Sequence, residues 1–420
     1  MAWIKEKIKK YWSKIGPGLV TGAADDDPSG IATYSQAGAG FGFTYLWLAA
    51  YTYPLMAVVQ EMCARIALVT GRGLAANIRA HFSKYALYLC GGLVVFANTL
   101  TIGADLGGMA DAVRIFLPDI PIILPIIVIA LGSATLEIFL AYNDYARYLK
   151  LLAFSLLAYI AAGFVINLDW GSVLYAGFVP SFSFTKEGLI MMAAIFGTTI
   201  SPYLFFWGAS EEVEEEIRMG EDTVEKRKVA GPKELKRARS DIWGGMFFSN
   251  LVAFFIIAVC AATLFPAGIT DIQSAGDAAK ALFPLAGNGA TLLFALGIIS
   301  TGLLAIPVLA GSSAYIIAEA FSWKEGLYRK PGDAKAFYSI IALSVIFGIL
   351  FNILGINPIK ALIYSSVANA LVAPVSLVFV VILAGSGRVM GEWKSGKVSI
   401  AIGWLTIGIM VALGWGIFFL

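Results

Sequence analysis

The feature that most constrains this chain is a succession of apolar stretches, each long enough to cross a lipid bilayer. A membrane-spanning helix needs about 20 mostly apolar residues, and the sequence offers eleven such stretches. They are residues 17–41, 44–69, 86–117, 121–142, 148–167, 188–209, 241–265, 286–320, 337–354, 358–384 and 398–419. Because 59% of the residues are hydrophobic and only 14% are charged, a soluble enzyme, a nucleic-acid binder and a disordered protein are excluded. We predict an all-α integral membrane protein with the lipid bilayer as its surroundings.

The connections between these stretches indicate the orientation of the chain. Twenty-five of the thirty Lys and Arg residues fall in alternate connections. These are residues 1–14, 70–84, 143–150, 210–240, 323–336 and 385–397. Because positive charge marks cytoplasmic loops, we predict a multi-pass protein of the cell membrane with a cytoplasmic, amphipathic N-terminus and an extracytoplasmic C-terminus. For 210–240, which opens with EEVEEE, we favour a solvated helix extension over an acidic vestibule that attracts cations.

Cysteine and histidine are too scarce for several kinds of site. The three cysteines, Cys63, Cys90 and Cys260, lie inside apolar runs, so a disulfide framework or a zinc ribbon is not expected. The single histidine, His81, excludes an imidazole metal site and a chain of histidine proton carriers.

The first apolar stretch is interrupted by three acids. Asp25, Asp26 and Asp27 are followed by Pro28, which removes a backbone donor and clashes with the preceding helical turn. Ionisable residues at membrane depth are costly, and a broken backbone is tolerated there only where it lines a protein cavity. We therefore predict two half-helices joined by an extended segment near residues 25–30. The alternative is a structural kink in which the acids cap helix ends.

The sixth apolar stretch is interrupted in the same way, by Gly-Thr-Thr-Ile-Ser-Pro-Tyr at residues 197–203. The two breaks are five spans apart, so the two helices run in opposite directions. Matching breaks in two halves predict an inverted-repeat transporter fold with its site at the breaks. We expect one transmembrane domain that consists of a first repeat (15–167), a second repeat (188–384) and an eleventh helix (398–419).

The side chains at the breaks indicate a hard cation. Carboxylates, hydroxyls and freed backbone carbonyls are oxygen donors that suit Mg²⁺, Ca²⁺ or Mn²⁺. We expect Asp27 to supply the main charge, with Asp26 as a second acid and with Thr198 and Ser201 as neutral donors. Asp105, a buried acid of the third stretch, is interpreted either as a relay or as a paired interior acid. Asn369 is interpreted either as a donor to the site or as an interhelical packing contact.

Several motifs resemble the Nramp (natural resistance-associated macrophage protein) family of divalent-metal transporters. They are Gly16-Pro17-Gly18-Leu19, Asp27-Pro28-Ser29-Gly30, Gln36-Ala37-Gly38-Ala39-Gly40-Phe41-Gly42, Cys63-Ala64-Arg65, Thr70-Gly71-Arg72 and Ala104-Asp105. The resemblance extends over essentially the whole chain. It implies the LeuT-like fold, with two inverted five-helix repeats and a metal bound between helices 1 and 6.

The sequence departs from this family at the positions that the resemblance assigns to the metal. Gly30 stands where the family has an asparagine ligand, Thr198 where it has an alanine, Ser201 where it has a methionine and Tyr203 where it has a histidine. Ser366 is aligned with the family's glutamine. A second family histidine corresponds to Gly208, and an acid of the third helix to Gly108. The resemblance therefore implies a wider and harder site, similar to that of the Nramp-related magnesium transporters.

We expect a secondary transporter, not an enzyme, that takes up largely hydrated Mg²⁺ and also Mn²⁺ by alternating access. The missing histidines argue against proton coupling. No cofactor, nucleic acid or obligate protein partner is expected besides the divalent cation and the bilayer. The alternatives are a proton-coupled Mn²⁺/Fe²⁺ transporter of the main Nramp type and a Na⁺-coupled carrier of an organic solute on the same fold.

Overall fold

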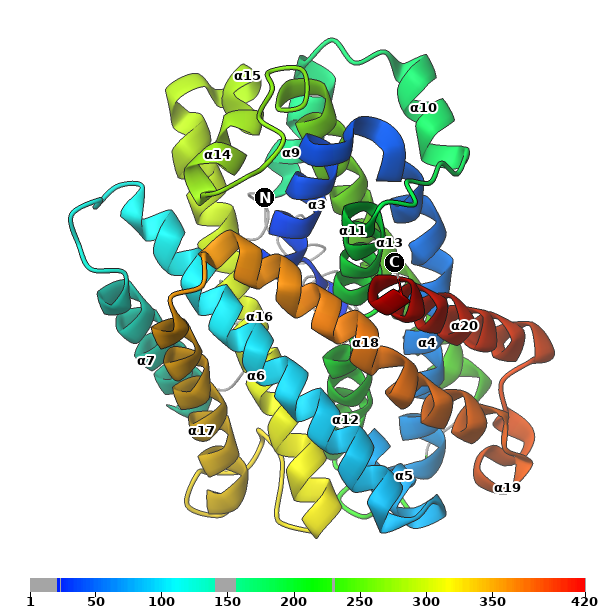
Figure 1. Ribbon diagram of the computed structural model, residues 1–420. Coiled ribbons are helices and arrows are strands. Elements are labelled where there is room, and N and C mark those ends of the chain that lie inside the picture. The colour runs from blue at the N-terminus through cyan, green and yellow to red at the C-terminus, as the bar shows by residue number, and fades with distance from the viewer. Residues whose placement is uncertain (1–20, 23, 140–155, 229–230, 420) are drawn as a thin grey trace, which may run out of the picture.

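The computed structural model describes residues 21–22, 24–139, 156–228 and 231–419, and every regular element in this part of the chain is a helix (Figure 1). The long helices are α3 (Pro28–Phe41), α4 (Leu46–Thr70), α6 (Lys84–Arg114), α7 (Ile123–Phe139), α11 (Lys186–Thr199), α12 (Pro202–Arg218), α13 (Pro232–Thr263), α16 (Ala290–Phe321), α17 (Lys335–Phe351), α18 (Pro358–Gly385) and α20 (Lys397–Phe419). The short ones are α5 (Leu74–His81), α9 (Leu157–Val165), α10 (Trp170–Phe178), α14 (Ala275–Ala279), α15 (Phe283–Ala286) and α19 (Gly387–Met390). The predicted amphipathic N-terminus (1–14) and the predicted basic connection 143–150 lie outside the described residues.

Most of the predicted apolar stretches correspond to long helices, but α7, in the stretch 121–142, is shorter than a membrane span, and the stretch 148–167 lies partly outside the described residues. Eight helical segments of the described residues are long and apolar enough to cross a membrane, with α3 and α4 counted together and α11 and α12 counted together. Residues 210–240 are helical at both ends, as the preferred helix extension predicts, because α12 continues to Arg218 and α13 already begins at Pro232. The ends of the spanning helices therefore project beyond their apolar parts.

The first predicted break is present. Residues 24 and 25 are helical, Asp26 is a bend, and Asp27 is extended (φ −69°, ψ 172°) as the N-cap of α3. Pro28 occupies the first turn of α3, where its missing N–H costs no helical hydrogen bond. The Asp-Pro pair thus ends one half-helix and starts the next.

The second predicted break is also present. Ile200 (φ −110°, ψ 61°) and Ser201 (φ −80°, ψ 128°) leave helical geometry between α11 and α12. Pro202 begins α12 as Pro28 begins α3. The same pattern, a non-helical residue followed by a proline that begins the next helix, therefore occurs twice. The two breaks leave carbonyl and amide groups free in the protein interior.

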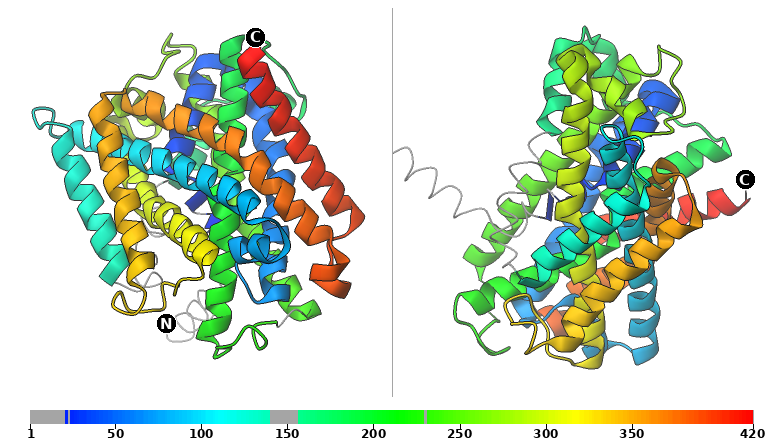
Figure 2. Two further views of the ribbon diagram at one scale, coloured as in Figure 1. Left: turned by 60° about the horizontal axis from the view of Figure 1, so that its bottom comes forward. Right: turned by 90° about the vertical axis from the view of Figure 1, so that its left-hand side faces the viewer.

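Close helix packing holds the two broken helices in the centre of the molecule. α3 packs against α13 and α18, and α11 packs against α18 as well. α6 runs alongside α16 and α18 (Figures 1 and 2). Glycines allow these approaches, because a Cβ at Gly22 would meet the backbone of Gly245, and a Cβ at Gly197 would collide with the Ser366 carbonyl oxygen.

Replacing Gly197 by alanine tests this packing. The added methyl group has no space between α11 and α18, and overpacking of this kind costs about 1–3 kcal/mol. We expect Gly197→Ala to lower the melting temperature of the purified protein in detergent by several degrees. Gly92→Ala is the matched control, because a Cβ at this helical glycine meets nothing within 4 Å. Equal melting temperatures for the two variants would contradict the packing argument.

Candidate metal site

Asp27 lies at the centre of the first break and is held by the helix that it caps. Its Oδ1 accepts hydrogen bonds from the Gly30 amide (2.7 Å) and from the Ser29 hydroxyl (2.6 Å). The side chain is 2% exposed, so the carboxylate is shielded from solvent. The amide groups and the positive end of the α3 dipole favour a negative charge at this place.

Gly30 brings the two breaks face to face. A Cβ atom built on Gly30 would lie 3.1 Å from Thr198 Oγ1 and 3.5 Å from both Asp27 Oδ1 and the Asp25 carbonyl oxygen. Thr198 is buried, and its hydroxyl has no hydrogen-bond partner among the described residues. The predicted residues Asp27, Gly30 and Thr198 therefore surround one small region that is lined by oxygen atoms.

Ser201 and Tyr203 link the second break to its surroundings. The Ser201 hydroxyl donates to the carbonyl oxygens of Gly197 (2.9 Å) and Thr198 (2.8 Å), in the last turn of α11. The Tyr203 hydroxyl donates to the Ala24 carbonyl oxygen at 3.2 Å. Ser201 thus binds the carbonyl oxygens of its own break, whereas Tyr203 joins α12 to the first broken helix.

Asp25 and Asp26 face a residue that sequence reasoning missed. Ser249 of α13 lies with its hydroxyl 2.9 Å from Asp25 Oδ2 and 3.0 Å from Asp26 Oδ1. Its single hydrogen serves one carboxylate at a time, so the two acids share one donor. The polar pair Ser249-Asn250 inside the apolar run of α13 was the available signal in the sequence.

The lesser candidates are distributed around the first break. Asp105 of α6 is fully buried, neither of its oxygens has a hydrogen-bond partner among the described residues, and its charge interacts with that of Asp27. Ser366 of α18 accepts a hydrogen bond from Thr33 of α3 at 3.2 Å. Asn369 donates to Thr101 of α6 at 3.2 Å, a contact between two helices. Of these three residues only Asp105 carries a charge, and this charge interacts with that of Asp27.

The three acids of the first break do not form one cluster. Among the described residues, no group of three or more His, Cys, Asp or Glu side chains has an arrangement that could hold a metal ion. Asp25 and Asp26 face Ser249, whereas Asp27 faces Gly30. A cation beside Asp27 would therefore be surrounded mostly by neutral oxygen atoms.

The preferred interpretation of the EEVEEE segment is wrong for most of its acids. Four glutamates of α12 are buried, not solvated: Glu211, Glu212, Glu214 and Glu216. Glu214 accepts hydrogen bonds from Tyr315 and from Arg218, the latter at 3.0 Å. Helix α12 carries its acids into contact with α16 and α13, which the charge pattern alone did not indicate.

Glu325, in the loop between α16 and α17, predicts a pH effect. Burial raises the pKa of Glu325 from 4.5 to about 9, the charges of Glu319 and Glu214 raise it further, and Arg227 and Arg329 oppose the shift. The folded protein therefore holds a proton that the unfolded chain releases, so its contribution to stability is complete below pH 4.5 and is lost as the pH rises through about 9. We expect the melting temperature to fall between pH 7 and pH 9.5, and Glu325→Gln to flatten this dependence in scanning fluorimetry. An identical pH profile for wild type and variant would contradict the assignment.

Comparisons with solved structures identify the fold. A manganese transporter from Eremococcus coleocola superimposes with a TM-score of 0.76 at 20% identity. The match covers 96% of this chain and 86% of the chain of the transporter. Mhp1 in an inward-facing conformation matches with a TM-score of 0.54 at 14% identity over 96% of this chain and 90% of its own. A Na⁺-coupled sialic acid symporter matches with a TM-score of 0.52 at 13% identity over 96% of both chains. The predicted LeuT-like fold, with two inverted five-helix repeats, an eleventh helix and broken helices 1 and 6, is thereby confirmed.

Curated relatives match along nearly the whole chain. The divalent metal cation transporter MntH of Aeromonas hydrophila is 24% identical over 406 residues, which are 95% of this chain and 93% of the relative. MntH of Bradyrhizobium diazoefficiens is 27% identical over 417 residues, which are 95% of this chain and 87% of the relative. The natural resistance-associated macrophage protein-like (Nramp) family profile matches residues 18–419. This protein is therefore a member of the Nramp family of membrane proteins.

Proposed function

We propose that this protein takes up divalent cations, Mg²⁺ and also Mn²⁺, across the cell membrane by alternating access and without proton coupling. The substrate binds largely hydrated between the broken helices 1 and 6. Asp27 supplies the main charge, Asp26 adds a second carboxylate near the site, and Gly30, Thr198 and Ser201 form its wall. The basic connections orient the protein with its N-terminus in the cytoplasm.

The observation that carries this proposal is the meeting of Asp27 with Gly30 and Thr198 across the two breaks. Only oxygen donors lie at these breaks, because residues 25–30 and 197–203 contain no thioether, thiol or imidazole. Softer transition metals prefer sulfur and imidazole ligands, whereas Mg²⁺ prefers carboxylate, carbonyl and water. The donor set therefore favours a hard cation.

The helix ends at the breaks add to the attraction for a cation. α11 ends at Thr199, and its last carbonyl groups are at the negative end of the helix dipole. The Asp25 carbonyl oxygen, at the end of the first half-helix, lies on the same side of Gly30 as Thr198 Oγ1 and Asp27 Oδ1. Unwound carbonyls and half-helix C-termini coordinate cations in transporters of this architecture.

The absence of a side chain at Gly30 favours a hydrated substrate. A longer residue there would occupy the region between Asp27 and Thr198, since even a Cβ would lie 3.1 Å from Thr198 Oγ1. Mg²⁺ gives up its water shell reluctantly and usually keeps several waters in protein sites. A site with one central carboxylate and several neutral oxygens leaves coordination positions for these waters.

The experiment that tests the proposal is uptake into proteoliposomes that contain a Mg²⁺ dye or a Mn²⁺ dye, with a pH dye in parallel. We expect both cations to enter and the internal pH to stay constant during uptake. Absence of divalent uptake, with the protein intact and correctly inserted, would overturn the assignment. Internal acidification that depends on Mn²⁺ entry would overturn the uncoupled mechanism.

A proton-coupled Mn²⁺/Fe²⁺ transporter is the second candidate. Curated relatives carry the name divalent metal cation transporter, and a structural relative is a manganese transporter. Asp105, whose carboxylate is buried without a hydrogen-bond partner among the described residues, is the group that favours this alternative. In this case Asp105→Asn would abolish acidification while metal binding persists. A Na⁺-coupled carrier of an organic solute is disfavoured, because three adjacent acids repel an anionic substrate.

A further inference from the structure

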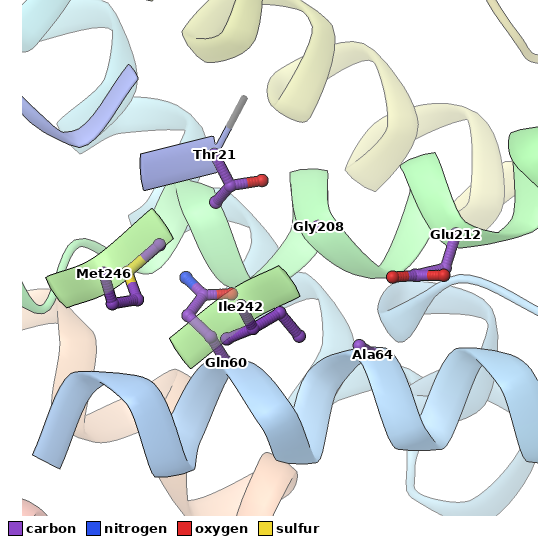
Figure 3. Close-up of a pocket in the computed structure, with 7 residues that line it drawn as sticks. All are labelled: Thr21, Gln60, Ala64, Gly208, Glu212, Ile242 and Met246. Atoms are coloured by element: carbon purple, nitrogen blue, oxygen red, sulfur yellow. The ribbon is translucent and has the colours of Figure 1, made fainter. Parts of the chain in front are cut away.

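A small pocket lies next to the first broken helix and is not part of the site described above. Thr21 of the first half-helix, Gln60 of α4, Gly208 and Glu212 of α12, and Met246 of α13 line it (Figure 3). Its volume is about 10 Å³, which is room for a single water molecule. Four separate helical segments therefore enclose a space that is large enough for a small polar guest.

Two buried polar side chains that line this pocket each have one atom without a protein partner. Glu212 is 3% exposed and Gln60 is 2% exposed. Glu212 Oε2 and Gln60 Nε2 have no hydrogen-bond partner among the described residues. Figure 3 shows the Gln60 amide and the Glu212 carboxylate reaching the pocket from α4 and α12. Unpartnered buried groups of this kind cost free energy unless a guest satisfies them.

The pocket is one helical turn away from the acids of the first break, on two helices. Thr21 precedes Asp25 by four residues, which is about 6 Å along a helix and on the same helix face. On α13, Met246 lies three residues before Ser249, and the hydroxyl of Ser249 binds Asp25 and Asp26. The pocket also lies towards the 210–240 segment, the side that the basic connections assign to the cytoplasm.

The charges around the pocket favour a cation over an anion. Arg237 pairs with Glu215 at 3.4 Å and with Glu216 at 3.9 Å, and no cation of the described residues lies within 4 Å of the Glu212 carboxylate. The negative charges of Glu215, Asp241 and Glu216 act on Glu212, and the positive charge of Arg237 opposes them. The surrounding charges therefore disfavour an anionic guest, and the unpartnered polar atoms disfavour an apolar one.

We propose that Glu212 and the Gln60 carbonyl oxygen form a second cation subsite, which a divalent ion occupies after it leaves Asp27 and before it reaches the cytoplasm. This inference rests on the proposed transport function. In this conformation the pocket has room for one water, so the hydrated ion occupies it when α12 and the first half-helix separate. Carboxylate and amide oxygens are the ligands that Mg²⁺ and Mn²⁺ accept.

Transport kinetics of the full-length protein in proteoliposomes test the subsite. We expect Glu212→Gln to lower the maximal rate of Mn²⁺ uptake about tenfold while the external KM changes by less than about twofold. Glu225→Gln, which removes the same charge from an exposed position of the same connection, should keep the wild-type rate. Equal rates for both variants, or a parallel rise of KM in Glu212→Gln, would overturn the subsite.

A direct measurement of Mn²⁺ binding distinguishes a ligand role of Glu212 from a purely structural role. Electron paramagnetic resonance counts bound Mn²⁺ in detergent on Asp27→Asn protein, in which the central site is disabled. We expect a residual Mn²⁺ site that weakens about tenfold on adding Glu212→Gln and tightens about tenfold on adding Gln60→Glu. Unchanged binding in both double variants would show that the pocket holds water only. Because binding is measured without transport, failure of the subsite is distinguishable from failure of the transport proposal, in which wild-type vesicles take up no divalent cation.

Discussion

Asp27→Ala is expected to lower the uptake rates of both Mg²⁺ and Mn²⁺ at least about tenfold, which corresponds to about 1.4 kcal/mol or more. Asp27 is the carboxylate that faces Gly30 and Thr198 across the two breaks. A substrate cation between neutral oxygens only would lose its main electrostatic attraction. Dye-loaded proteoliposomes measure the rate, and titration calorimetry of the detergent-solubilised protein measures the loss of binding.

The control must separate charge from helix capping. Asp27 also caps α3 through the Gly30 amide, and replacing an N-cap by alanine costs about 0.5–2 kcal/mol of stability. Asparagine is an equally good N-cap but carries no charge. We therefore expect Asp27→Asn to keep the wild-type melting temperature and still to lose uptake. Normal uptake by Asp27→Asn would show that Asp27 has only the capping role.

The broken helices could be predicted from the sequence because the signal is local. Pro28 and Pro202 remove backbone donors inside otherwise apolar spans, and the structure breaks within two residues before each proline. The apolar stretches likewise predicted most of the long helices of the described residues, but not the short helices between them. Each of these features depends on neighbouring residues along the chain.

The partners of the site residues could not be predicted, because they come from distant helices. Ser249 reaches Asp25 and Asp26 from more than 200 positions away, and nothing near the acids in the sequence indicates it. The burial of the α12 glutamates was not predicted for a related reason. Their charge pattern is typical of a solvated surface helix, but α12 packs against α16, from which Tyr315 donates a hydrogen bond to Glu214. Charge pattern predicts exposure only where no other helix covers that face.

Replacing Ser201 by methionine is expected to shift selectivity from Mg²⁺ towards Mn²⁺. The thioether introduces a soft donor at the second break, beside the carbonyl oxygens that the Ser201 hydroxyl now binds at 2.8 and 2.9 Å. Mn²⁺ accepts such a donor more readily than Mg²⁺, which prefers oxygen. We expect the ratio of kcat/KM for Mn²⁺ over Mg²⁺ to rise at least about tenfold, or about 1.4 kcal/mol. Uptake of Cd²⁺, which prefers sulfur ligands more strongly than Mn²⁺ does, should rise further.

Ser201→Ala separates the effect of sulfur from the effect of the lost hydroxyl. Both substitutions free the carbonyl oxygens of Gly197 and Thr198 from the Ser201 hydroxyl, but only methionine adds a soft ligand. If the donor chemistry sets selectivity, Ser201→Ala leaves the Mn²⁺ to Mg²⁺ ratio near that of wild type while Ser201→Met raises it. An equal shift in both variants would mean that the freed carbonyls, not the sulfur, decide between the ions. The hard-donor argument for a Mg²⁺ substrate would then lose its physical basis, because selectivity would follow from the geometry of the break.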